Sequence, residues 1–253
     1  MKRLAAAMAL SLTAACTHRA RVAPVTDGRA VLAQMHDHYA GKWYNTLTFQ
    51  QKTDINRRDG THEVQTWYES LKGPHWLRID QGLPSLGNGV LYSSDSVYLM
   101  RGGQLTRAVN VGNPFIPLIM GVYLQPVDRT IADLAPYHFN LDQMHRGELD
   151  GRPVYVVGTE DPVDSISPQF EVDTERLILL RMRVGFGPPG SPLADAHLMN
   201  LVETGGGWLA TKVAIANGGN MQTEEYADWH TRMDLSDALF DVHQWTTAPH
   251  WAH

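Results

Sequence analysis

Residues 90–109 read VLYSSDSVYLMRGGQLTRAV, and the pattern of this stretch decides the fold class. Three short runs rich in apolar residues are separated by two turn signals, Ser93 to Asp95 and Gly102-Gly103. Short runs joined by such tight turns are typical of β-hairpins. The stretch therefore predicts an antiparallel meander, in which each strand pairs with the next along the chain.

The same pattern continues on both sides of this meander. Strands are expected from Trp43 to about residue 80, and again from about 141 to 233, where Gly-rich turns stand at 205–207 and 217–219. We count about eleven strands in all. Neither a 20–50-residue repeat nor a linker divides the chain. The fold class expected from these patterns is mainly β, with minor α.

Two segments depart from the two-residue period of the strands. Residues 27–41 place apolar side chains at helical spacing, with Asp27 as a capping residue and Gly41 at the end. Residues 113–139 contain the apolar run NPFIPLIMGVYL and a second short helix over 128–134. A helical insertion between two runs of strands usually packs across one face of the sheet.

The N-terminal stretch MKRLAAAMALSLTAAC has the three parts of a secretory leader. Lys2 and Arg3 supply positive charge, and residues 4–12 form an apolar segment too short to span a bilayer. Small residues then precede Cys16, the single cysteine of the 253-residue chain. A lone cysteine excludes an internal disulfide and a cysteine-based zinc site.

This leader resembles that of a bacterial lipoprotein, in which small residues precede an obligatory cysteine that receives lipid. The resemblance implies that residues 1–15 are a signal peptide and that Cys16 is the lipidated first residue of the mature chain. Thr13 departs from the pattern, which prefers Leu, Val or Ile at that place. The alternative is ordinary secretory cleavage with Cys16 nearby by chance. If Cys16 is lipidated, residues 16–26 form a lipidated N-terminus and a tether to the folded domain.

Composition places the chain among ordinary globular proteins. Hydrophobic residues make up 43% and charged residues 19%, and the formal net charge is −6. Nucleic-acid-binding proteins usually carry a basic patch, and no cluster of Lys and Arg stands out here. The sequence therefore predicts no nucleic-acid partner.

The order of the predicted elements resembles the LolA/LolB superfamily of outer-membrane lipoprotein carriers and receptors, with their lipoprotein-sorting relatives. Three stretches carry this resemblance: YSSDSVYLMRGGQL, FEVDTERLILLRM, and GGGWLATKVAI continuing to MDLSDALFD. It covers residues 27–242. It implies a strongly curved, incomplete antiparallel barrel whose open face is covered by helices. It also implies an apolar cavity between sheet and helices that holds acyl chains.

The helical insertion at 113–139 has more hydrophobic side chains than is usual for a helix with one solvent-exposed face. It is either buried core or the lining of a cavity, and both interpretations stay open. Methionines suit an adaptable lipid pocket as well as a core, and tryptophans on strands are more often core than ligand contacts. The candidate cavity residues are Trp43, Phe49, Met100, Phe115, Ile116, Ile119 and Met120.

Residues for catalysis or metal binding are scattered. His36 and His38 are two apart on a predicted helix, so they point to different sides and do not chelate one ion together. No nucleophile elbow of the form GxSxG occurs. The pair Glu224-Glu225 is interpreted as exposed charge, although a carboxylate pair across the barrel mouth stays open. We therefore expect no enzyme, no cofactor and no metal.

Together these patterns predict a cell-envelope lipoprotein that binds lipid or acyl chains, with a role in lipoprotein sorting or transfer to the outer membrane. We expect a monomer on the periplasmic face of that membrane, anchored through Cys16, and a mobile, irregular tail at 243–253. A soluble periplasmic protein is the alternative location. The alternative functions are a sensor or scaffold of the same fold that binds a protein partner, and a cell-envelope enzyme.

Overall fold

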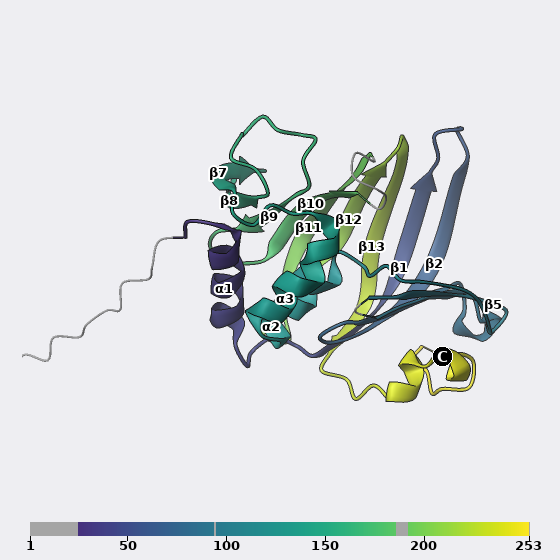
Figure 1. Cartoon of the computed structure of the whole chain (residues 1–253). Helices are drawn as coiled ribbons and strands as arrows, with labels where there is room; N and C mark the ends of the chain where they lie inside the picture. Colours follow the sequence, from purple (N-terminus) through teal and green to yellow (C-terminus); the bar gives the residue numbers. More distant parts are fainter. Residues whose placement is uncertain (1–24, 94, 186–191, 253) are drawn as a thin grey trace, which may run out of the picture.

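The computed structural model describes residues 25–93, 95–185 and 192–252. The predicted signal peptide and the predicted lipidation site at Cys16 lie outside these ranges. Within them, thirteen antiparallel strands form one sheet in the order β6-β5-β4-β3-β2-β1-β13-β12-β11-β10-β9-β8-β7 (Figure 1). The sheet does not close, because β6 and β7 are its two edges.

The strands alternate with short turns, and few helices accompany them. The strands are β1 (Thr46–Asn56), β2 (His62–Lys72), β3 (Trp76–Gln81), β4 (Gly89–Tyr92), β5 (Val97–Arg101), β6 (Gln104–Val109), β7 (Met144–Leu149), β8 (Arg152–Val157), β9 (Gln169–Asp173), β10 (Leu179–Gly185), β11 (Leu193–Thr204), β12 (Gly207–Asn217) and β13 (Asn220–Thr231). The helices are α1 (Gly28–Tyr39), α2 (Val122–Leu124) and α3 (Val127–Leu134). Single turns of other helix types are η1 (Pro84–Leu86), η2 (Pro117–Gly121), η3 (Ala135–Tyr137), η4 (Asp237–Phe240) and η5 (Val242–Gln244).

The mainly β, antiparallel fold class is confirmed, but the expected strand count of about eleven was too low. The three short runs within residues 90–109 do form three separate strands, as their turn signals predict. The strand β4 is 4 residues long and β5 is 5 residues long, yet each pairs with both of its neighbours. Tight turns allow such short segments to form separate strands.

The first and last strands lie side by side in the middle of the sheet. Strand β1 pairs with β13 on one side and with β2 on the other. The chain therefore runs outward from β1 to the edge strand β6. It then passes through η2, α2, α3 and η3 and re-enters the sheet at the opposite edge, β7. This connection has to travel from one edge of the sheet to the other.

The helix α1 follows the sequence prediction. Asp27 caps it through a hydrogen bond from the amide of Ala30 to its Oδ1, at 2.8 Å, and the chain leaves the helix before Gly41, where φ is +69°. Gly28 packs tightly on the sheet, since a Cβ there would clash with Cγ1 of Val157. In Figure 1 the helix stands beside α2 and α3.

One large hydrophobic core joins the helices to the sheet. Its buried members come from α1, from the insertion η2 to η3, and from strands on both sides of β1. A smaller second core lies between the sheet and the C-terminal segment. It contains Leu91, Met100, Leu235, Leu239, Phe240 and Trp245.

The C-terminal segment differs from the expected mobile tail. Trp245 is only 2% exposed, and its ring lies 3.8 Å from the guanidinium carbon of Arg78. Trp251 donates a hydrogen bond from Nε1 to Oγ of Ser70 at 2.8 Å. The two indole rings give this irregular segment enough buried surface to pack against the sheet. The sequence pattern missed this because these residues have no helical or strand period.

Candidate functional site

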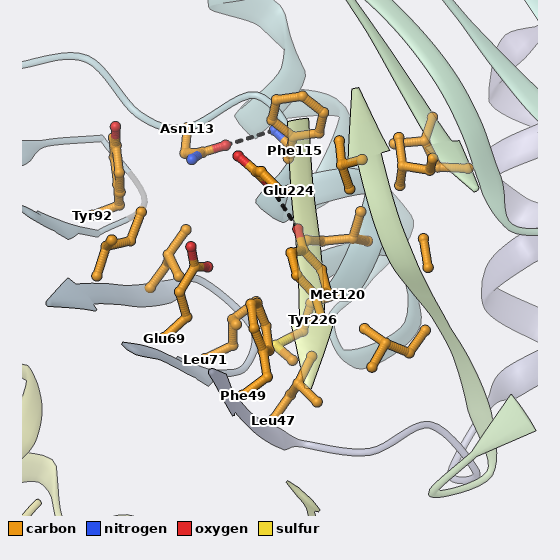
Figure 2. Close-up of a pocket in the computed structure, with 18 of the residues that line it drawn as sticks. Leu47, Phe49, Glu69, Leu71, Tyr92, Asn113, Phe115, Met120, Glu224 and Tyr226 are labelled. Carbon is orange, nitrogen blue, oxygen red and sulfur yellow. Dashed lines mark hydrogen bonds between the residues drawn. The ribbon is translucent and has the colours of Figure 1, made fainter. Parts of the chain in front are cut away.

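A cavity of about 470 Å³ lies between the sheet and the helical insertion. Its wall is formed mainly by apolar side chains of the sheet and of residues 111–123. Figure 2 shows Leu47, Phe49 and Leu71 on the sheet side and Phe115 and Met120 on the insertion side. The volume is within the range of about 300–1,000 Å³ that small-molecule pockets occupy.

Five of the seven predicted cavity residues line this cavity. They are Trp43, Phe49, Phe115, Ile119 and Met120. Two pairs of stacked rings stiffen the wall: Trp43 on Tyr123, with ring centroids 3.7 Å apart, and Phe49 on Tyr226, at 4.1 Å. Aromatic pairs of this kind add to the stability of a packed surface.

The other two predicted residues are not part of the cavity wall. Ile116 is buried in the main core. Met100 is fully buried in the second core, against the C-terminal segment. Successive strand residues point to opposite faces of a sheet, and Met100 pairs with Gly89, on the face that also carries Leu91. Its apolar character alone did not show which face it occupies.

Two glutamates interrupt the apolar wall. Glu69 on β2 is 7% exposed and Glu224 on β13 is 9% exposed. Both strands flank β1, where Phe49 pairs with Glu69 and Thr53 pairs with Glu224. Phe49 and Thr53 are an even number of residues apart, so the two glutamates share the cavity face of the sheet. Figure 2 shows both carboxyl groups among the residues that line the cavity.

The two carboxyl groups have different partners. Glu224 accepts hydrogen bonds from Nε2 of Gln222 at 2.6 Å and from the hydroxyl of Tyr226 at 2.8 Å. For Glu69, no side-chain hydrogen bond or ion pair is found within the described residues. Among the described residues that line the cavity there is no Lys, Arg or His. The acid pair therefore has no cationic partner there.

Burial shifts the protonation of both groups. Burial raises the pKa of Glu69 well above its usual value, and the negative charge of Glu224 raises it further. Burial also raises the pKa of Glu224, while the hydrogen bonds from Tyr226 and Gln222 act in the opposite direction. The pair thus favours its protonated form until a donor or a positive charge is brought to it.

The expectation that Glu224 and Glu225 are both exposed was wrong for Glu224. The side chain of Glu225 is 54% exposed and lies 3.3 Å from Nζ of Lys212. Glu224, its neighbour in the chain, points to the other face and is buried. Two adjacent glutamates on a strand necessarily face opposite sides, and the sequence did not indicate which one faces inward.

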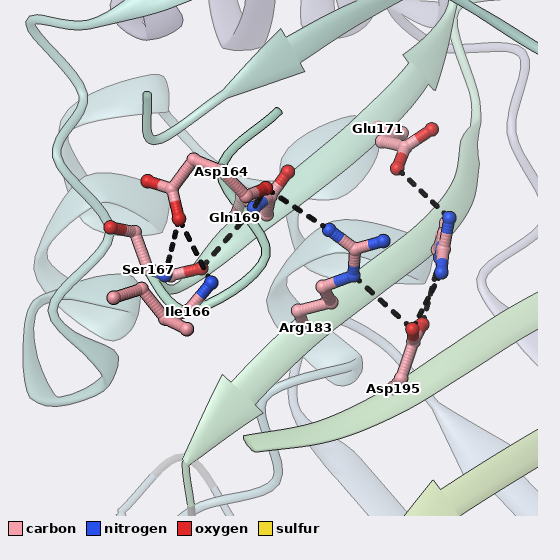
Figure 3. A network of polar contacts seen from close by, with 8 residues as sticks. Asp164, Ile166, Ser167, Gln169, Glu171, Arg183 and Asp195 are labelled. Atoms are coloured by element: carbon pink, nitrogen blue, oxygen red, sulfur yellow. Dashed lines mark hydrogen bonds and ion pairs between the residues drawn. The ribbon is translucent and has the colours of Figure 1, made fainter. Parts of the chain in front are cut away.

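A second polar network, on β9 to β11, has its charges paired (Figure 3). Asp195 binds Arg181 at 2.6 Å and Arg183 at 3.2 Å, and Glu171 lies 3.7 Å from Arg181. Arg183 also donates to the carbonyl of Asp164 at 3.3 Å. These contacts hold the loop between β8 and β9 against the sheet, so this network is structural.

The loop itself is ordered by Asp164. Its carboxylate accepts hydrogen bonds from the amides of Ile166 and Ser167, at 2.8 and 3.0 Å, and hydrogen bonds from this segment lower its pKa to about 2. Figure 3 shows these contacts. The loop presents Val163 and Ile166 to solvent, at 82% and 85% exposure.

Residues 25–93, 95–185 and 192–252 hold no group of three or more His, Cys, Asp or Glu placed to bind a metal ion. Within these ranges no helix has both the length and the hydropathy that crossing a bilayer requires.

Several solved structures share this fold at low sequence identity. A DUF1329 family protein from Desulfovibrio piger superposes with a TM-score of 0.56 at 16% identity, covering 85% of this chain and 95% of that one. A LolA superfamily protein from Nitrosomonas europaea gives 0.52 at 11% identity, and a domain assigned to outer membrane lipoprotein sorting from Vibrio parahaemolyticus gives 0.52 at 13%. For both, the superposition covers 85% of this chain and 97% of the other.

The structural neighbours are thus LolA superfamily and lipoprotein-sorting proteins, as the sequence resemblance predicted. At these identities the similarity shows the fold. No family model matches the sequence, and no curated protein matches it either.

Proposed function

We propose that this protein is a non-catalytic binding protein of the cell envelope that holds an acyl chain in the cavity between sheet and insertion. The observation that carries the proposal is the cavity itself, with about 470 Å³ of space and a mainly apolar wall. The neighbours with this fold include lipoprotein-sorting proteins, which supports a role in handling lipid-bearing molecules.

The driving force for binding is burial of apolar surface. Transfer of hydrocarbon from water into such a cavity contributes about 25 cal/mol for each Å² removed from water. In this proposal the insertion covers the open side of the curved sheet. Phe115, Ile119 and Met120 then form the movable part of the wall, and their displacement admits the chain.

The test is uptake of a fluorescent fatty acid by the lipid-free protein, with two matched variants. Ala210 lines the cavity on β12, whereas Ala214 on the same strand does not. Both are half-buried. Ala210→Trp fills the cavity and should weaken binding at least about tenfold, which corresponds to roughly 1.4 kcal/mol. Ala214→Trp should bind as the wild type does.

The result that would contradict the proposal is a lipid-free protein that stays folded and takes up neither the fatty acid nor a neutral fluorescent hydrocarbon. Equal binding by the wild type and the Ala210→Trp variant would place the ligand outside this cavity. If a pull-down yields a stoichiometric protein partner without lipid, the sensor or scaffold alternative is favoured instead.

We also propose attachment to the outer membrane through a lipid on Cys16, because the leader MKRLAAAMALSLTAAC resembles that of a lipoprotein. Several acyl chains on one residue hold a protein on a membrane much better than one chain does. Mass spectrometry of the native protein should find an acylated Cys16 at the N-terminus. An unmodified mature chain in the periplasmic fraction would establish the soluble alternative.

A further inference from the structure

An apolar ligand explains most of the cavity wall, but it does not explain the two glutamates. Burying a carboxyl group is costly unless it is paired or hydrogen-bonded. Elsewhere in the described chain, buried acids have cationic partners: Glu171 lies 3.7 Å from Arg181, and Asp80 lies 2.8 Å from Arg78. Glu69 and Glu224 have no such partner.

Two side-chain donors on the strands around Glu69 are engaged elsewhere. Nε1 of Trp67 donates to Oε1 of Gln65 at 2.5 Å, and Nε2 of Gln51 donates to Oγ1 of Thr53 at 2.8 Å. The hydroxyl of Tyr226 is bound to Glu224. Glu69 is only 7% exposed and lines the cavity, and its carboxyl group accepts no side-chain hydrogen bond from the described residues.

The charged and titratable groups around the pair do not neutralise it. Besides Glu69 and Glu224, the titratable side chains of the cavity wall are Tyr44, Tyr92, Tyr123 and Tyr226. Burial raises the pKa of each of these phenols, so all four are neutral near pH 7. An anionic head group placed here would disfavour ionisation of both glutamates still further, in a site with no cation in its described wall.

We propose that the cavity binds an amphiphile with a positively charged, hydrogen-bond-donating head group, an ammonium on a hydrocarbon chain, with the head at Glu69 and Glu224. The inference rests on the proposed function, because the apolar wall has to take the chain. An ammonium supplies the donors that Glu69 lacks and the charge that both carboxylates lack. The two glutamates then select the head group, while the apolar wall holds the tail.

The experiment compares three ligands that share a twelve-carbon chain: dodecylammonium, dodecanol and dodecanoate. Each is used at pH 7, the two ionic ligands below their micelle concentrations and dodecanol below its solubility limit, in competition with the neutral fluorescent hydrocarbon diphenylhexatriene. Hydrogen bonds to charged groups contribute about 1.5–3 kcal/mol. Dodecylammonium should therefore displace the probe at a concentration at least about tenfold lower than dodecanoate does, with dodecanol between them.

Three variants assign the preference to the cavity glutamates. Glu69→Gln and Glu224→Gln keep the shape of the side chain and should each reduce the ammonium preference about tenfold, since one charge-assisted contact is lost. Glu225→Gln is the matched control, because it removes a neighbouring carboxylate that faces the other way. It should keep the wild-type preference. Circular dichroism checks that each variant is folded.

The outcomes separate the inference from the proposed function. Equal displacement by all three ligands overturns the inference and leaves an unselective acyl-chain cavity. A preference that survives in both Glu69→Gln and Glu224→Gln also overturns it. If neither the probe nor any ligand binds the folded protein, the proposed function fails, and the inference fails with it.

Discussion

The two faces of the sheet at β2 and β3 differ in whether their buried charged groups have partners of opposite charge. On the face toward the C-terminal segment, Arg78 and Asp80 are 1% and 0% exposed. They form a bidentate ion pair, with both N–O distances at 2.8 Å. Arg78 also donates to the carbonyls of Leu239 and Trp245, at 3.0 and 2.8 Å. Both of these buried charges meet partners from the chain itself.

The cavity face begins one residue away. Ser70 pairs with Arg78 across β2 and β3, and the next residue, Glu69, pairs with Ile79 and points to the opposite face. There Glu69 borders the cavity and its mainly apolar wall. The comparison shows that buried charge is paired where the C-terminal segment packs directly on the sheet. The unpaired acids stand where the chain leaves room for something else.

Loss of the paired arginine should have the largest effect. Arg78→Met leaves Asp80 buried without its main partner, and breaking a buried ion pair typically costs about 3–5 kcal/mol. Urea denaturation measures this loss. The control is Arg57→Met, which removes an exposed pair with Glu63 and should cost about 0–1 kcal/mol. Similar small losses for both variants would contradict the pairing argument.

The second core and the cavity wall should also differ in how much stability is lost when a buried side chain is shortened to alanine. Met100→Ala removes a fully buried side chain of the second core and should cost about 2–5 kcal/mol. Ile119→Ala should cost less, because Ile119 already adjoins the cavity and its loss only enlarges an existing space. Thermal and urea unfolding of the two variants test this order. A larger loss for Ile119→Ala than for Met100→Ala would contradict the cavity beside Ile119.

The free energy of unfolding, measured as a function of pH, should depend on the protonation of Glu69. The pKa of Glu69 is raised by folding, so the folded state holds its proton more tightly than the unfolded chain does. This stabilisation is complete below the unfolded pKa, about 4.3 for a glutamate. It is lost as pH rises through the folded pKa.

The variant Glu69→Gln removes this pH dependence. The free energy of unfolding of Glu69→Gln relative to the wild type should therefore rise as pH increases from about 4 toward 8. Urea denaturation at several pH values measures the difference. The matched variant Glu225→Gln should give a nearly constant difference. A constant difference for Glu69→Gln as well would show that burial does not raise its pKa.

The smallest effect is expected at the exposed loop residues. Val163→Ser and Ile166→Ser remove side chains that are 82% and 85% exposed, and surface changes usually lie within about 0.5 kcal/mol. Unfolding curves that overlay the wild type are expected. Asp164→Ala in the same loop should cost more, because two backbone amides lose their acceptor.

Local patterns were sufficient to predict much of the fold. Turn signals such as Gly102-Gly103 predicted the meander, and the cap at Asp27 predicted α1. What they missed depended on tertiary contacts. The face of Met100, the inward turn of Glu224 and the packing of Trp245 are all set by what lies opposite each residue in space. A two-residue period gives two faces, but it does not tell which face becomes a cavity.

The pairing of β1 with β13 also constrains how the chain is made. The centre of the sheet joins the beginning of the domain to its end, so its hydrogen bonds cannot form until nearly the whole chain has left the ribosome. Until then β1 has an open edge along its length. Pairing between distant segments is slow and leaves intermediates prone to aggregation. A chain with this topology should therefore depend on chaperones during its synthesis.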